Sequence, residues 1–327
     1  MLRSNVGRRA WLAGGAVLLA APLRAQQAGR SYRIGWLSST ARSEPYAVAM
    51  VQRLAELGFV EGRNLVIELR SGPPSEDSYA ALAGELARLK CDLYFAPGNP
   101  IGLRAVLQAT RDAPIITVAS DFDPVAAGFV ASLARPGGRI TGVSQLVAEL
   151  PGKRLEVAKE LLPRLARVAI LADSASEGQL KASRDAAAKL GLELVVYEFT
   201  KAPYDLAAAF ARFAAARVQA LVPLTSGFFA VQRRAIVDMT LQQRLPTIFA
   251  SSVWADLGGL LSYGPDFSAS YRRAAEMVVK LLGGANPAEM PVEQPNVVEM
   301  VLNMKTAKAL GVVVPPTIRL RAERVIE

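Results

Sequence analysis

The chain has 327 residues, of which 51% are hydrophobic and 20% are charged, and its formal net charge is +9. This composition describes a globular chain with enough residues for two modest α/β domains or one large domain, and it excludes an intrinsically disordered protein. Histidine is absent and Cys91 is the single cysteine, which excludes a Ser-His-Asp triad and an intrachain disulfide.

The N-terminal segment has the order of an export signal. Arginines, among them the pair Arg8-Arg9, precede the apolar stretch 10–22, and Ala25 is a small residue at a plausible cleavage point. We predict that residues 1–25 are an export signal peptide, of the twin-arginine type or an ordinary secretory one. Its removal takes away four arginines and no acid, which lowers the formal net charge from +9 to +5.

An alternation of strand and helix patterns fills the first part of the remaining chain. The predicted strands are 31–39, 64–69, 92–96, 114–119 and 140–144, and the predicted helices are 44–57, 76–90 and 101–111. Such regular alternation indicates a parallel sheet with right-handed crossovers. The fold class is therefore α/β.

The same pattern then restarts. Helices are predicted over 150–162, 176–190, 205–216, 228–243, 268–282 and 306–310, and strands over 167–171, 192–199, 218–224, 247–250, 260–263 and 297–302. Pro315-Pro316 is predicted to open an extended tail. Late returning segments suggest two lobes joined by several crossings, the first from 31–145 with 266–295 and the second from 146–265 with 296–327.

Polar and aromatic side chains follow many of these strands. Because ligands collect at the carboxyl ends of strands in α/β sheets, we predict that these residues face one cleft. They are Ser38, Ser39, Asn99, Ser120, Asp121, Asp123 and Ser144 in the first half, and Asp173, Thr225, Ser251, Trp254 and Tyr263 in the second half.

This set of groups suits a small zwitterion that is held without reaction. Hydroxyls and backbone N–H groups at helix starts would bind a carboxylate, and Asp121, Asp123 or Asp173 would bind an ammonium. Each residue also has a structural alternative, since an Asp or Ser after a strand often caps the next helix, and Asp123 before Pro124 could form a capped turn. No Gly-rich phosphate loop, Walker lysine or metal-loop signature is found, so no catalytic residue, cofactor or metal is predicted.

The Lys and Arg residues are scattered along the predicted helices, without a basic stripe interleaved with aromatic residues. Nucleic acid is therefore not expected as a partner.

Several segments resemble the substrate-binding proteins of ABC transport systems. They are 54–64, 123–125, 131–138, 153–156, 262–265, 271–275, 302–311, 315–316 and 321–326. The resemblance implies a type I periplasmic-binding-protein fold, with two Rossmann-like lobes joined by a multi-crossing hinge. It also implies an exported, periplasmic and monomeric protein that delivers a small organic ligand to an ABC permease in the inner membrane.

Relatives of this family bind aromatic amino acids such as tryptophan. Carried over by position, the ligand carboxylate would meet Ser38, Ser39, Asn99 and Ser120. Asp173-Ser174 departs from the Asn-Pro pair that is common at that position, which leaves the ligand class open. Two other functions compete, a ligand-sensing module for a membrane receptor and an exported α/β enzyme, and the absence of histidine disfavours the enzyme.

Overall fold

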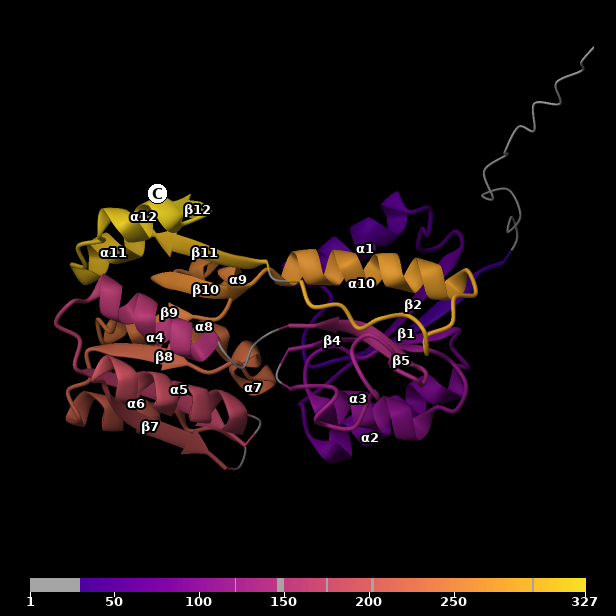
Figure 1. The fold of residues 1–327 in the computed structure, drawn as a ribbon, viewed down its shortest axis with the longest axis horizontal. Coiled ribbons are helices and arrows are strands. Elements are labelled where there is room, and N and C mark those ends of the chain that lie inside the picture. Colours follow the sequence, from indigo (N-terminus) through magenta and orange to yellow (C-terminus); the bar gives the residue numbers. More distant parts are fainter. Residues whose placement is uncertain (1–29, 121, 146–149, 175, 201–202, 296) are drawn as a thin grey trace, which may run out of the picture. The chain divides into compact units, whose positions relative to one another are not determined.

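Two sets of strands organise the chain in a computed structural model that describes residues 30–120, 122–145, 150–174, 176–200, 203–295 and 297–327. The predicted signal peptide and Asp121 lie outside the described residues. Ser31–Glu327 forms one unit, in which each set of strands is covered by helices (Figure 1).

A parallel sheet of five strands forms the first set, in the order β2-β1-β3-β4-β5. Its strands are β1 (Tyr32–Ser38), β2 (Leu65–Ser71), β3 (Leu93–Phe95), β4 (Ile115–Ala119) and β5 (Ile140–Ser144). Every residue of β4 and β5 is buried, as expected for strands that carry helices on both faces. The parallel arrangement confirms the prediction from the alternation of strand and helix patterns.

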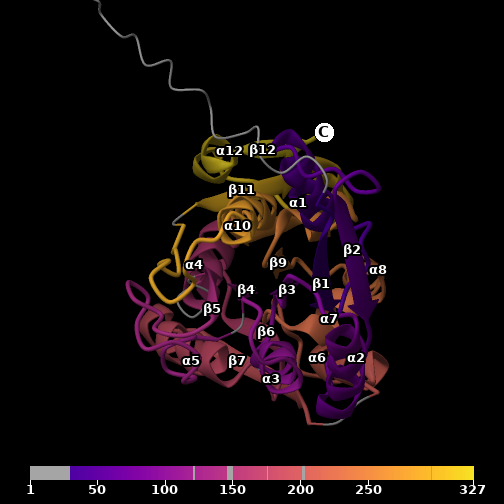
Figure 2. The same cartoon turned by 90° about the vertical axis from the view of Figure 1, so that its right-hand side faces the viewer.

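Helices from distant parts of the sequence cover this sheet. On one face lie α1 (Pro45–Glu56) and α10 (Phe267–Leu282), and on the other lie α2 (Glu76–Arg88) and α3 (Pro100–Ala109). Strand β1 contacts both layers, because Ile34 and Trp36 pack with α1 and α10 while Leu37 packs with α2. Figures 1 and 2 show α10, in orange, beside α1, in indigo, so a helix from the second half of the chain completes the first layer.

The second set of strands has two parts. Three parallel strands run in the order β7-β6-β8, and four more run in the order β12-β11-β10-β9. A bridge between Leu221 and Thr247 joins the two parts. The strands are β6 (Arg167–Asp173), β7 (Glu193–Phe199), β8 (Ala220–Pro223), β9 (Ile248–Phe249), β10 (Leu261–Pro265), β11 (Val298–Asn303) and β12 (Arg324–Ile326).

Two apolar clusters cover the faces of this second set. The first packs α4 (Leu150–Leu161), α5 (Glu177–Leu190), α11 (Met304–Leu310) and α12 (Pro316–Arg321) against the strands. The second packs α6 (Leu206–Ala215), α7 (Gly227–Val231), α8 (Arg233–Gln242) and α9 (Ser252–Asp256) against them. We call β1–β5 with α1–α3 and α10 the first lobe, and the other described elements the second lobe.

The chain passes between the lobes after β5, after β10 and before β11. Because β11 re-enters the second lobe at the edge where β10 leaves it, these two strands are antiparallel and Pro265 lies opposite Val298. The other pairings within the second set are parallel.

Hydrogen bonds join the first crossing to the chain next to the other two. Gln145 Nε2, at the first crossing, donates to Ser270 Oγ in the first turn of α10 at 3.0 Å. Ser144 N donates to the carbonyl of Glu293, near the third crossing, at 2.8 Å. The crossings are therefore held next to one another rather than acting as independent linkers.

Two predicted elements differ from the structure. The helix predicted over 228–243 is divided at Gln232 into α7 and α8. The extended tail predicted from Pro315-Pro316 was wrong, because α12 and β12 follow it. Proline at the first position of a helix loses no hydrogen bond, and Ile318 is fully buried in the second lobe, which anchors this segment.

Glycine is required at position 264, within β10. A Cβ atom at Gly264 would lie 1.8 Å from the carbonyl oxygen of Ala250. Only glycine therefore allows β10 to approach the residue that follows β9.

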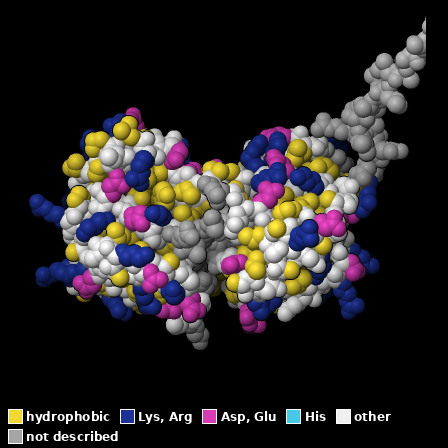
Figure 3. Space-filling view, in the orientation of Figure 1, with side chains coloured by type: hydrophobic (Ala, Val, Ile, Leu, Met, Phe, Trp, Pro, Cys, Tyr) yellow, Lys and Arg dark blue, Asp and Glu magenta, His cyan; other side chains and the backbone are white. Residues whose placement is uncertain are grey.

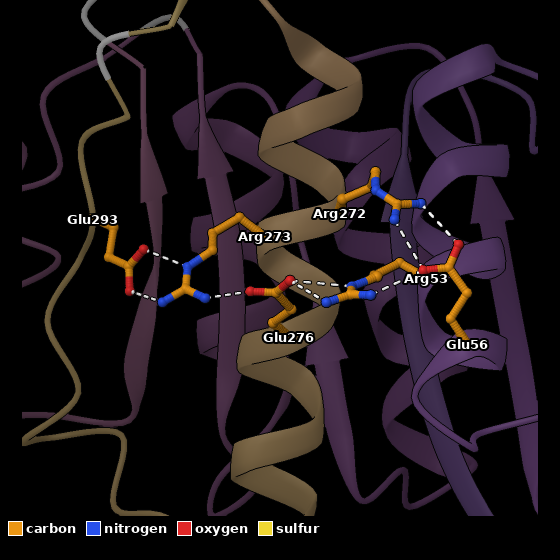
Figure 4. Close-up of polar contacts among 6 residues, drawn as sticks. All are labelled: Arg53, Glu56, Arg272, Arg273, Glu276 and Glu293. Atoms are coloured by element: carbon orange, nitrogen blue, oxygen red, sulfur yellow. Dashed lines mark hydrogen bonds and ion pairs between the residues drawn. The ribbon is translucent and has the colours of Figure 1, made fainter.

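A chain of ion pairs joins α1, α10 and the segment before β11 (Figure 4). At one end, Arg273 Nε and Nη2 donate to the Glu293 carboxylate at 2.6 and 2.7 Å. Arg273 also contacts Glu276, and Arg53 Nη2 donates to Glu276 at 2.7 Å. The members are Glu293, Arg273, Glu276, Arg53, Glu56 and Arg272.

Glu293→Gln should lower stability only where the wild-type carboxylate is charged. The hydrogen bond from Arg273 holds the pKa of Glu293 below its ordinary value of 4.5. This contribution is therefore complete above pH 4.5 and is lost as the pH falls through the lowered pKa. Since the side chains are 35% exposed, we expect a loss of only about 0.5–1 kcal/mol at neutral pH by urea unfolding.

The matched control is Glu289→Gln, in the same segment, whose side chain is exposed and accepts a hydrogen bond from Asn286. It should leave the unfolding free energy unchanged. A loss in Glu293→Gln that persists at strongly acidic pH would contradict an ionic origin.

Candidate functional site

A cavity of about 820 Å³, including the space open to solvent at its mouth, is lined by residues of both lobes. It lies where loops follow the carboxyl ends of β1, β4, β8 and β9. In parallel sheets the backbone leaves the strands at this edge, so the loops are free to carry ligand-binding groups.

Hydroxyls and aromatic rings form the first-lobe wall. Ser38, at the end of β1, accepts a hydrogen bond from Thr40 N at 3.1 Å, and the Tyr46 hydroxyl donates to Thr40 Oγ1 at 3.2 Å. The Tyr46 ring centroid lies 5.9 Å from that of Phe267 and 4.8 Å from that of Tyr271. We call Tyr46, Phe267 and Tyr271 the aromatic wall.

The tyrosine hydroxyls of the aromatic wall stay protonated at neutral pH. Burial, with a further contribution from the charge of Glu44, raises the pKa of Tyr46 to about 12. Burial also raises the pKa of Tyr271 well above its ordinary value. Both rings therefore act as neutral, largely apolar surfaces.

The second-lobe wall combines hydroxyls, Trp254 and one cation. Thr225 and Ser226 follow β8, and Trp254 lies in α9, stacked on Phe249 at 4.8 Å between ring centroids. Arg233, at the start of α8, also lines the cavity. Its Nη2 lies 2.5 Å from Glu44 Oε1, a contact between the two lobes.

Buried polar groups hold the loop after β8 in place. Gln179, on α5, donates from Nε2 to the Thr225 carbonyl at 2.9 Å and accepts from Thr225 N at 2.9 Å. Asp173 accepts hydrogen bonds from Ser176 Oγ at 2.8 Å, from the Tyr204 hydroxyl at 3.2 Å and from Ser226 Oγ. The shape of the second-lobe wall thus depends on groups that do not line the cavity.

The structure brings together about half of the residues predicted from strand ends. Those that line the cavity are Ser38, Ser39, Ser120, Thr225, Ser251 and Trp254. The described residues that do not line it are Asn99, Asp123, Ser144, Asp173 and Tyr263, and Asp121 lies outside the described residues.

Several of these residues stabilise the local structure instead. Asn99 caps α3 by accepting from Gly102 N at 3.1 Å, and Asp123 is exposed and accepts from Val125 N at 2.8 Å. Ser144 is buried at the end of β5. These are the capping and turn alternatives that the sequence left open.

Tyr263 lies away from the cavity and contacts other residues of the second lobe. Its carbonyl accepts a hydrogen bond from Arg154 Nε at 2.9 Å. Its side chain lines a separate hollow of the second lobe that includes Lys153 and Met300.

Sequence reasoning missed the aromatic wall and Arg233. Tyr46 and Arg233 lie in the first turns of α1 and α8, and Phe267 and Tyr271 lie in the first two turns of α10, whereas the prediction used only residues that follow strands. The signal available was the pair of aromatic residues Phe267, directly before the predicted helix 268–282, and Tyr271, about one helical turn later.

The thiol of Cys91 does not line this cavity. Cys91 is buried, and burial raises its thiol pKa to about 11, so it is a poor nucleophile at neutral pH. Among the described residues, no cluster of Cys, Asp and Glu could hold a metal ion. In the same part of the chain, no helix is long and apolar enough to cross a membrane.

Asp173→Asn should destabilise the second lobe, because the amide keeps one acceptor oxygen but places N–H donors where the other carboxylate oxygen accepts hydroxyl donors, two of them at Oδ2. We expect the unfolding free energy to fall by about 2–3 kcal/mol in urea. Tyr204→Phe, which removes a single donor, should cost about 1 kcal/mol.

Asp185→Asn is the control for a lost charge, since Asp185 is exposed on α5 and pairs with Lys181. It should unfold like the wild type. An Asp173→Asn variant as stable as this control would show that the buried cluster contributes little.

The sequence is similar to those of known proteins. The family model for ABC transporter substrate binding protein matches residues 44–326. A tyrosine-binding protein of Clostridioides difficile (strain R20291) is 26% identical over 263 residues, which cover 80% of this chain and 74% of that protein.

Solved structures share the fold. An ABC domain from Streptococcus pneumonia in complex with L-Trp superposes with a TM-score of 0.80 at 24% identity and covers 90% of this chain and 100% of that one. A conserved domain protein from Vibrio cholerae O1 biovar El Tor has a TM-score of 0.81 at 21% identity, with the same coverage. These likenesses confirm the predicted type I periplasmic-binding-protein fold with two lobes.

Proposed function

The chain belongs to the ABC transporter substrate binding protein family, and from this premise we propose that it binds an aromatic amino acid in the cavity between its lobes. The family consists of binding proteins rather than enzymes, and its members present a small molecule to a membrane permease. Membership of the family does not specify the ligand, so the aromatic amino acid is the part that we propose.

The aromatic wall carries this proposal. Tyr46, Phe267 and Tyr271 offer ring surface from the first lobe, and Trp254 adds an indole from the second lobe. An aromatic ring buried against such surfaces gains both apolar burial and ring–ring contacts. The relatives that bind tyrosine and L-Trp support the same ligand class.

Hydroxyls would bind the polar end of the ligand. We propose that the predicted residues lining the cavity contact it, namely Ser38, Ser39, Ser120, Thr225, Ser251 and Trp254. A ligand that touches groups of both lobes favours the closed form by the difference in its contacts between the two forms. Asn99, Asp123, Ser144, Asp173 and Tyr263 are proposed to shape the loops around it.

The proposal also covers export, oligomeric state and the extent of each lobe. Residues 1–25 would direct export to the periplasm by the twin-arginine or the general secretory route, and the mature chain would act as a monomer. The lobe boundaries would be 31–145 with 266–295 and 146–265 with 296–327.

On the face shown in Figure 3, Lys and Arg lie among Asp and Glu, which supports a small-molecule ligand over nucleic acid.

Isothermal titration of the mature protein with an amino-acid panel tests the ligand class. We expect L-tryptophan or L-tyrosine to bind with a Kd of about 1 μM, which corresponds to about 8 kcal/mol. L-leucine should bind at least about tenfold more weakly, because it lacks ring contacts worth about 0.5–1.5 kcal/mol each. Failure of every aromatic amino acid to bind would remove this proposal.

Phe267→Ala should weaken binding of an aromatic amino acid by about tenfold, because it removes one ring of the aromatic wall. Phe59→Ala is the matched control. Phe59 packs on Tyr32 in the first lobe, at 5.7 Å between ring centroids, and does not line the cavity. Equal losses of affinity in the two variants would indicate a general effect on the first lobe.

A further inference from the structure

The cavity is poor in charge. Its lining holds hydroxyls, glycines, prolines, small apolar residues and aromatic rings, and among the described residues Arg233 is the only charged one. A ligand carboxylate that leaves water needs a charged partner or several hydrogen-bond donors. The described lining thus offers one cation for this task.

The guanidinium of Arg233 is fixed by two contacts. Nη2 lies 2.5 Å from Glu44 Oε1, and Nη1 donates to the Ala230 carbonyl at 3.2 Å. An arginine fork carries more N–H donors than these two contacts use. The described contacts therefore orient the group and leave donors for a ligand.

Glu44 is buried where a carboxylate is costly. Its side chain is 7% exposed, and its Oε2 atom is buried with no hydrogen-bond partner among the described residues. Burial of a carboxylate is tolerated when a cation pairs with it, and here that cation is Arg233, 189 residues away in sequence and in the other lobe. Glu44, from the first lobe, therefore holds the cavity-lining side chain of Arg233, from the second lobe, in place.

The charge pair adjoins the aromatic wall. Glu44 precedes Tyr46 by two residues, and its charge acts on the hydroxyls of both Tyr46 and Tyr271. Arg233 lines the same cavity as this wall, and its charge also acts on the Tyr46 hydroxyl. Hydroxyls at strand ends, which the sequence favoured as carboxylate partners, would assist rather than replace this cation.

We infer that Arg233 binds the carboxylate of the ligand and that Glu44 is a positioning residue that holds Arg233 from the other lobe. The inference rests on the proposed function, because it names a contact within the same cavity. The competing explanation is that Arg233 only joins the lobes and makes no contact with the ligand.

Titrations with L-tryptophan and tryptamine, which lacks the carboxylate, separate these explanations. If Arg233 binds the carboxylate, the wild type should prefer tryptophan by about 10- to 100-fold, as expected for a charge-assisted hydrogen bond. In Arg233→Gln this preference should shrink about tenfold. A preference that stays at the wild-type value, with both ligands weakened equally or not at all, would overturn the inference and leave the proposed function intact.

Arg234→Gln is the matched control. Arg234 is the next residue on α8, its side chain is 70% exposed, and it pairs with Asp238 rather than lining the cavity. Both affinities should stay at their wild-type values. Arg233→Lys keeps the charge without the planar fork, so it should give an intermediate preference even if Arg233→Gln folds poorly. Absence of binding of tryptophan and of tyrosine to the wild type would remove the proposed function and the inference together.

A double-mutant cycle tests the role of Glu44. Glu44→Gln should weaken tryptophan binding about three- to tenfold in the wild-type background, since charge pairs of this kind couple strongly. In the Arg233→Gln background the same substitution should have no further effect. Independent, additive losses would show that Glu44 does not act through Arg233.

Discussion

Helix α10 sets the architecture, because it follows strands β6–β10 of the second lobe in sequence but buries its apolar face on the first sheet. Tyr271, Ala274 and Met277 lie in the same cluster as Ile34 and Trp36 of β1. To place α10 there, the chain must leave the second lobe after β10 and return before β11. The multiple crossings between the lobes are thus a consequence of where one amphipathic helix finds its partner.

The same helix connects packing to the ligand cavity. Its first two turns supply Phe267 and Tyr271 to the aromatic wall, while Ser270, between them in sequence, accepts a hydrogen bond from Gln145 at the first crossing. Farther along, Arg273 pairs with Glu293 near the third crossing. Residues that line the cavity and residues that contact the crossings therefore lie within two turns of α10, so movement of one lobe against the other must change the shape of the cavity.

The two lobes contribute different chemistry to the cavity. The first lobe supplies neutral rings and hydroxyls, and the second supplies an indole, hydroxyls and the guanidinium of Arg233. Two carboxylates that do not line the cavity hold residues that do, since Asp173 accepts a hydrogen bond from Ser226 and Glu44 pairs with Arg233. This division keeps buried acids paired and leaves the lining itself nearly neutral, which suits a ligand that must be released again.

The sequence by itself determined the α/β class, the parallel first sheet and the family, because these depend on hydrophobic periodicity and on local motifs. It also located Ser38, Ser39, Ser120, Thr225, Ser251 and Trp254 near one cavity, since strand ends in parallel sheets share an edge. Only the tertiary structure decided that Asn99 and Asp123 serve as cap and turn, and that Pro316 begins a helix. It alone brought Glu44 to Arg233 and placed α10 beside α1, because contacts between residues about 200 positions apart follow from how the lobes pack and leave no periodic signal in the chain.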